Sequence, residues 1–140
     1  LEGIIYYLDA DRKHGKILSL DESLLPWYKW NSSNNSASYP VSDWINTKKE
    51  SNPAWKLPTI DDLTTLFSYR FGVNESSIGN NGMPLKYASS AGGTYWSSEE
   101  VHNNGSYPRY IKCFKGYSAT GQTIESSWEA THSVRAIASF

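Results

Sequence analysis

The chain has 140 residues, enough for one domain and too few for two of ordinary size. Its 13 basic and 14 acidic residues give a formal net charge of −1, which argues against a nucleic-acid partner and a polybasic membrane surface. No apolar run approaches the roughly 18 residues that a membrane-spanning helix needs, so we expect no membrane insertion by this segment. The single Cys113 excludes an intrachain disulfide and an all-cysteine metal site.

The first third of the chain predicts a hairpin followed by a polar loop. Gly3–Leu8 is rich in β-branched and aromatic residues, which predicts a strand buried on both faces. Turn-forming residues follow up to Gly15, which is free to adopt a positive φ. Lys16–Leu20 continues as the second, antiparallel strand. Asn31–Ser38 consists almost entirely of Asn and Ser, which predicts a surface loop.

Two helices are predicted in the middle of the chain. Val41–Lys49 is compatible with a short helix. Thr59 precedes a clearer one, with Asp62 at the acidic position of a capping box. Apolar residues then recur at helical spacing as far as Phe71, and Gly72 ends the run.

The second half predicts a loop and three strands. Val73–Gly93 is dense in Asn, Gly and Ser, whereas Thr94–Ser97, Arg109–Lys115 and Ser133–Phe140 have strand character. Strands near both ends with helices between them predict a single α+β domain over residues 1–140, whose terminal strands lie adjacent. Because the sequence begins at Leu1 without a signal-like segment, we expect it to be cut from a longer protein, from which a signal peptide or upstream domains have been removed.

Several segments of the sequence resemble a catalytic or metal-binding motif, but each lacks a residue that the motif requires. Around Ser118 the second glycine of a nucleophile elbow is displaced to Gly121. The segment that begins at Asp9 resembles a calcium loop, but Lys13 occupies a ligand position. The three histidines are scattered, which favours lone surface residues over a zinc site assembled from distant loops. Cys113, within a predicted strand, is typical of a buried, inert thiol. We therefore expect no enzyme activity, no metal and no cofactor.

Four short boxes occur in a fixed order along the chain: Gly3–Asp9 with His14–Gly15, Trp55–Thr59 with the helix that follows, Tyr95–Ser98, and Val134–Ile137. In this order they resemble a bacterial C-type-lectin-like family, which includes the C-terminal domain of a bacterial collagen-like adhesin. The variable proteins of diversity-generating retroelements share that fold. The resemblance implies a C-type-lectin-like fold, export to the bacterial cell surface or extracellular space, and binding as the usual role.

Two activities associated with this fold do not transfer. The calcium–sugar triplets of animal C-type lectins are absent, since Tyr95–Ser97 stands in place of one of them. The formylglycine-generating sulfatase activators, which share the fold, need redox-active or copper-binding thiols, and one cysteine is insufficient. Within the boxes, we interpret Trp55 and Trp96 as core residues. Arg135 either holds a structural carboxylate or faces a ligand.

The candidate ligand-binding residues lie between the boxes, in the segment Val101–Trp128. Tyr and Trp give large, rigid contact areas at low entropic cost, and Asn, Ser and Gly adapt their hydrogen bonding. An excess of two positive charges there favours an anionic partner. Asn31–Ser38 is a second, weaker candidate. The predicted site residues are Asn103, Asn104, Tyr107, Arg109, Tyr117, Gln122, Glu125 and Trp128.

The sequence therefore predicts a non-catalytic, adhesin-type recognition domain of a bacterial surface or pilus-associated protein that binds a glycan or a protein. The alternatives are a hypervariable receptor-binding protein of a diversity-generating retroelement and a structural capping domain. Hypervariability confined to Val101–Trp128 among alleles would distinguish the first alternative.

Overall fold

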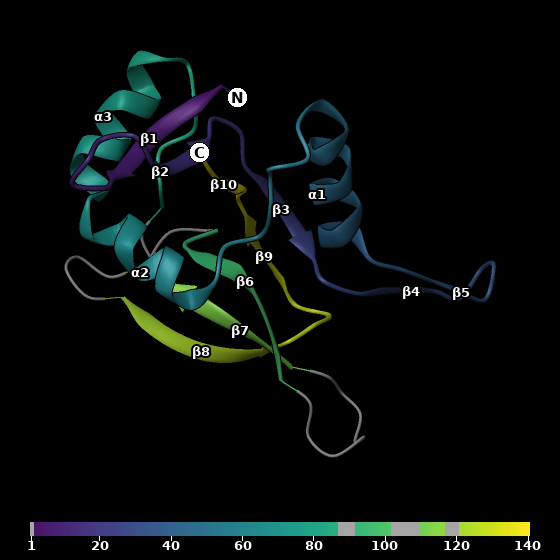
Figure 1. The fold of residues 1–140 in the computed structure, drawn as a ribbon. Coiled ribbons are helices and arrows are strands. Elements are labelled where there is room, and N and C mark those ends of the chain that lie inside the picture. The colour runs from purple at the N-terminus through teal and green to yellow at the C-terminus, as the bar shows by residue number, and fades with distance from the viewer. Residues whose placement is uncertain (1, 87–91, 102–109, 117–120) are drawn as a thin grey trace.

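The fold is known from a computed structural model that describes residues 2–86, 92–101, 110–116 and 121–140. These residues form three helices and ten strands, and most strand pairs are antiparallel (Figure 1). The predicted α+β class is confirmed. None of the helices in the described part of the chain is long and apolar enough to cross a membrane.

The first sheet joins the two ends of the chain. β2 (Gly15–Ser19) pairs antiparallel with β1 (Gly3–Leu8) on one side and with β10 (Ile137–Ser139) on the other. The predicted N-terminal hairpin is therefore confirmed. The expectation that the terminal strands lie adjacent is wrong: β1 and β10 belong to the same sheet, but β2 lies between them.

Two expectations about this hairpin are wrong. β1 is buried on one face only, because only that face packs on the apolar core: Ile4 and Tyr6 are buried while Ile5 is 54% exposed. The residue with positive φ in the turn is Arg12 (58°) and not Gly15. Gly15 is required for another reason, since a Cβ there would lie 2.4 Å from the carbonyl oxygen of Tyr7.

The second sheet has five strands in the order β3-β9-β6-β7-β8. The single strand predicted over Ser133–Phe140 is wrong: it divides into β9 and β10, which belong to different sheets, with Arg135 between them. Two strands were not predicted, β3 and β8. The bounds of the five are Ser23–Pro26 for β3, Thr94–Val101 for β6, Tyr110–Lys115 for β7, Gln122–Ser127 for β8 and Thr131–Val134 for β9.

The helices follow the predicted order with different ends. α1 spans Pro40–Ser51 and α2 spans Ile60–Ser68. The capping box of α2 is confirmed, since the Asp62 amide donates to Thr59 Oγ1 at 3.1 Å and the Thr59 amide donates to Asp62 Oδ2 at 3.0 Å.

The C-terminal end of the second predicted helix is wrong. The chain leaves helical geometry at Tyr69, where φ is −105° and ψ is 15°, and resumes as α3 (Arg70–Gly79). The loop predicted from Val73 is accordingly helical as far as Gly79. The break lets α2 pack on the second sheet and α3 on β1, which one straight helix cannot do.

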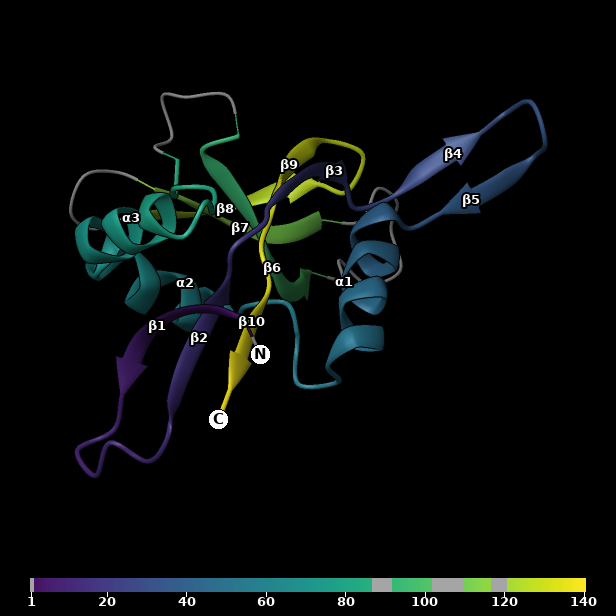
Figure 2. The same ribbon diagram turned by 90° about the horizontal axis from the view of Figure 1, so that it is seen from above.

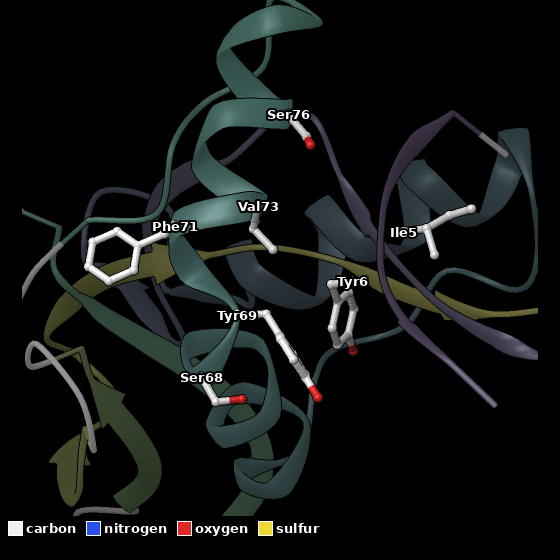
Figure 3. Close-up of a pocket in the computed structure, with 8 residues that line it drawn as sticks. Ile5, Tyr6, Ser68, Tyr69, Phe71, Val73 and Ser76 are labelled. Carbon is white, nitrogen blue, oxygen red and sulfur yellow. The ribbon is translucent and has the colours of Figure 1, made fainter. Parts of the chain in front are cut away.

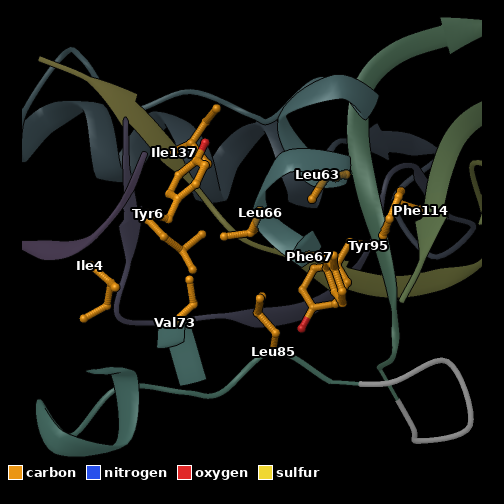
Figure 4. Packing of buried hydrophobic residues seen from close by; sticks show 11 residues of the cluster. Ile4, Tyr6, Leu63, Leu66, Phe67, Val73, Leu85, Tyr95, Phe114 and Ile137 are labelled. Atoms are coloured by element: carbon orange, nitrogen blue, oxygen red, sulfur yellow. The ribbon is translucent and has the colours of Figure 1, made fainter. Parts of the chain in front are cut away.

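A large apolar cluster fills the space between helices α2 and α3, the three-stranded sheet and the five-stranded sheet (Figure 4). Trp55 and Trp96 are buried, as predicted, at 5% and 0% exposure. The Trp96 indole N–H donates to the carbonyl oxygen of Leu25 at 2.7 Å and so links β6 to β3. Arg135 is also buried and lies 3.6 Å from Glu22, which assigns it the structural-carboxylate role of the two considered.

A small hairpin projects from the body of the protein (Figure 2). It consists of β4 (Lys29–Asn31) and β5 (Ser36–Ser38), which pair antiparallel and contain only exposed residues. The surface loop predicted for Asn31–Ser38 is indeed exposed, but its two ends form paired strands where an irregular loop was expected.

Candidate functional site: an aromatic groove at the base of the β4–β5 hairpin

A groove of about 540 Å³ lies where the projecting hairpin joins the body. Its walls come from the segment around β3 and β4, from the first residue of α1, and from the turn between β8 and β9. A volume of this size suits a small-molecule ligand. The lining residues are Leu25, Pro26, Tyr28, Lys29, Trp30, Pro40, Glu129 and Thr131.

Tyr28 is held in place by aromatic contacts. Its ring stacks on that of Trp128, with centroids 4.1 Å apart and an interplanar angle of 10°, and its amide donates to the Trp128 carbonyl oxygen at 2.9 Å. Tyr39 meets it edge-on at 5.6 Å. Because Trp128 is buried in the core, the position of the Tyr28 ring is fixed from behind.

The outer wall is aromatic and the rim is polar. Trp30, on β4, is 49% exposed and borders the same groove. Lys29 precedes it, and Glu129 and Thr131 approach from the β8–β9 turn; all three are exposed. The groove thus combines an exposed indole with a cation, an anion and a hydroxyl. Such a set can stack on an apolar ring face and exchange hydrogen bonds with hydroxyl groups.

The predicted ligand-binding residues fall into three groups. Gln122 and Glu125 are exposed on β8. Trp128 is 2% exposed, so its predicted place on the binding surface is wrong; it lies behind Tyr28 as support for the groove. Five others lie outside the described residues: Asn103, Asn104, Tyr107, Arg109 and Tyr117.

The predicted excess of two positive charges counts Arg109, Lys112, Lys115 and the nearby Arg135 against Glu125 and Glu129. Arg135 is buried beside Glu22 and contributes no surface charge, and Arg109 lies outside the described residues. Lys112 faces Glu125 across the β7–β8 pair. The rim of the groove carries one lysine and one glutamate, so the charges of the described residues that line it cancel and do not favour an anionic ligand.

One cluster in the described part of the chain has metal-ligand chemistry. The ligand atoms of Asp9, Asp11 and His14 lie within 4.8 Å of one another in the β1–β2 turn. The side chains are 45%, 50% and 65% exposed, and His14 Nδ1 lies 3.4 Å from an Asp11 oxygen. Contacts between His14 and these carboxylates on the surface account for this arrangement, and exposed acidic groups are common without a metal ion.

His132 does not fit the interpretation of lone surface histidines. It is half-buried, its ring meets Trp96 at 4.7 Å, and its Nε2 lies 2.7 Å from Ser126 Oγ. Burial, helped by Lys115, lowers the pKa of its imidazole. The described residues supply no carboxylate that orients the other ring nitrogen, so the pair lacks the third member of a catalytic triad. Cys113 is buried, which raises the pKa of its thiol to about 12, in line with an inert residue.

Sequence reasoning missed the groove because its parts are about 100 residues apart. The density of aromatic residues in Trp27–Trp30 is the one local signal. No family model matches the chain, and no curated protein matches it. The C-type-lectin-like resemblance is therefore still a prediction from the four boxes.

Proposed function

We propose that this chain is a non-catalytic recognition domain that binds a carbohydrate in the aromatic groove. The observation that carries the proposal is the half-exposed indole of Trp30 beside Tyr28, whose ring is fixed on the buried Trp128. Sugar rings present apolar C–H faces that stack on such side chains. A few rigid aromatic anchors usually dominate the binding energy of a recognition surface.

The rim favours a neutral sugar over an anionic one. Lys29, Glu129 and Thr131 offer both donors and acceptors to hydroxyl groups. An acidic sugar would meet Glu129 as well as Lys29, so it gains little from the charges. In the context of the predicted family, we propose that this binding takes place at a bacterial cell surface, as in an adhesin.

The test is a glycan array that carries neutral, sialylated and sulfated glycans, probed with the 140-residue chain. We expect a neutral glycan to bind, and Trp30→Ala to weaken this binding by ~5- to 150-fold, the range that 1–3 kcal/mol represents for one anchor. Trp30 lies on an exposed hairpin, so the melting temperature should stay the same. Phe71→Ala removes an aromatic ring that is 68% exposed elsewhere and serves as the matched control.

Two results would overturn the proposal. If no glycan binds, the ligand class is wrong. If a glycan binds and Trp30→Ala retains full affinity, the sugar occupies another surface, of which the loops between β6 and β8 are the first to test.

A further inference from the structure

The N-terminal sheet has an open edge. In the order β1-β2-β10, β1 pairs on one side with β2, and within the described residues no strand pairs with its other side. The backbone N–H and C=O groups of that side are therefore available to another strand. The strand bulges between Ile5 and Tyr7, so the regular edge is short.

Apolar side chains surround this edge. Ile5, Tyr7 and Leu8 on β1 are 54%, 39% and 42% exposed. Tyr69 and Phe71, at the junction of α2 and α3, are 55% and 68% exposed. Proteins usually protect an edge strand with charged side chains, whereas here the exposed positions are apolar, which marks an interaction surface.

A groove of about 470 Å³ runs along the same edge, between β1 and α3 (Figure 3). Ile5 and Tyr6 point to opposite faces of β1, yet both line the groove, so it follows the edge of the strand and not one face. On the helix side, Gly72 and Ser76 are one turn apart and small, which leaves room for a backbone. The lining residues, all described, include none with a charged side chain.

Tyr6 adds a polar group beside the groove. The residue is 7% exposed, and its buried hydroxyl has no hydrogen-bond partner among the described residues. Burial, with Asp62 nearby, raises the pKa of this hydroxyl, so it stays protonated and able to donate. Buried polar groups without partners are uncommon in folded proteins.

We propose that β1 accepts an extended peptide strand from a partner polypeptide, as a fourth strand of this sheet. The absence of charge in the groove selects a partner strand with uncharged, apolar side chains at alternate positions. A single strand is favoured over a second copy of this chain, because Phe71 projects beside the groove and the bulge shortens the edge. A folded sheet would meet both obstacles.

This surface is separate from the aromatic groove. Figures 1 and 2 both place β1 and α3 at one end of the molecule and the β4–β5 hairpin at the other. The peptide proposal therefore does not depend on the carbohydrate proposal, and either can fail alone.

The test uses a panel of capped seven-residue peptides with Val, Ile or Tyr at alternate positions and Thr between them. Binding is followed by NMR on the isotopically labelled chain. We expect shifts confined to β1 and α3, slower amide exchange in β1, and no binding of the same peptides with N-methylated backbones.

Two glycine variants give a matched pair. At Gly72 and at Gly79 an added Cβ meets nothing within 4 Å, and both residues lie in α3, but only Gly72 lines the groove. Gly72→Leu should keep or raise the melting temperature while reducing peptide affinity at least about tenfold. Gly79→Leu should leave the affinity unchanged.

Three results would overturn the proposal: no peptide of the panel binds, Gly72→Leu binds as well as the unmodified chain, or the chain alone forms dimers through β1. The last result would assign the edge to a second copy.

Discussion

The buried ion pair between Glu22 and Arg135 gives the sharpest test of the fold. The two side chains are 2% and 0% exposed, with Arg135 Nη1 at 3.6 Å from Glu22 Oε2. The same carboxylate accepts a hydrogen bond from the Tyr95 hydroxyl at 2.7 Å and lies 3.1 Å from Lys86 Nζ. Burial lowers the pKa of the Arg135 guanidinium, and Glu22 opposes that effect, so the charged arginine depends on its partner.

Glu22→Gln keeps the shape of the side chain and removes its charge. Lys86 is 31% exposed and can turn to water, but Arg135 would be left as an uncompensated buried charge. Breaking a buried pair in this way costs about 3–5 kcal/mol. Total stabilities of domains are about 5–15 kcal/mol, so the loss would be a large part of the whole.

Urea unfolding followed by tryptophan fluorescence measures the effect. With a slope of about 1–3 kcal/mol/M, the midpoint should fall by more than ~1 M. Glu75→Gln, the same change at an exposed position, is the control and should leave the midpoint in place. Adding Arg135→Met to Glu22→Gln should cost less than the sum of the single changes. A midpoint for Glu22→Gln equal to that of the control would refute the reasoning.

Four further predictions concern the core, a helix cap, the Asp62 carboxyl group and metal ions. Trp96→Ala should cost about 3–5 kcal/mol in a denaturant melt, because it removes a fully buried indole and its hydrogen bond; an unchanged midpoint would contradict the core assignment. Thr59→Ala should cost about 1 kcal/mol through loss of the cap. Burial opposes ionisation of Asp62, but hydrogen bonds from Lys16 and Thr59 outweigh it and lower the pKa of its carboxyl. The ionised Asp62 carboxylate therefore contributes its full stabilisation above the ordinary pKa of an aspartate, and this contribution is lost as the pH falls through the lower pKa of the folded state. Acid titration of the Asp62→Asn variant should not show this loss of stability. EDTA should leave the melting temperature unchanged, and a fall restored by calcium would assign a metal to the β1–β2 turn.

The parts of the fold that were predictable depend on neighbours in the sequence. The capping box of α2 needs only Thr59 and Asp62, three positions apart, and the N-terminal hairpin needs two apolar runs and a turn. The break at Tyr69 was not predictable, because helical spacing continues through it and packing against two different sheets decides it. β8 was missed because its sequence is mostly polar; as an edge strand it is held by backbone pairing with β7.

The candidate site was less predictable than the fold. Aromatic residues occur throughout this sequence, and their composition does not say which rings are exposed. Trp128 and Trp30 are chemically equivalent in the sequence, yet one is 2% exposed and the other 49%. The difference depends on Tyr28, which covers Trp128 from about 100 residues away in the chain. Sequence reasoning therefore could not tell which of these tryptophans is exposed.

The same stack gives the groove a rigid wall. Trp128 belongs to the buried cluster that contains Trp96, and Trp96 is fixed by its hydrogen bond to Leu25. Tyr28 rests on this cluster, so its ring orientation is set by folding and not by a ligand. A surface ordered in advance loses little conformational entropy on binding, which leaves more of the contact energy for affinity. Trp30 stands outside the cluster on an exposed hairpin, and in the proposed function it is the ring that contacts the sugar.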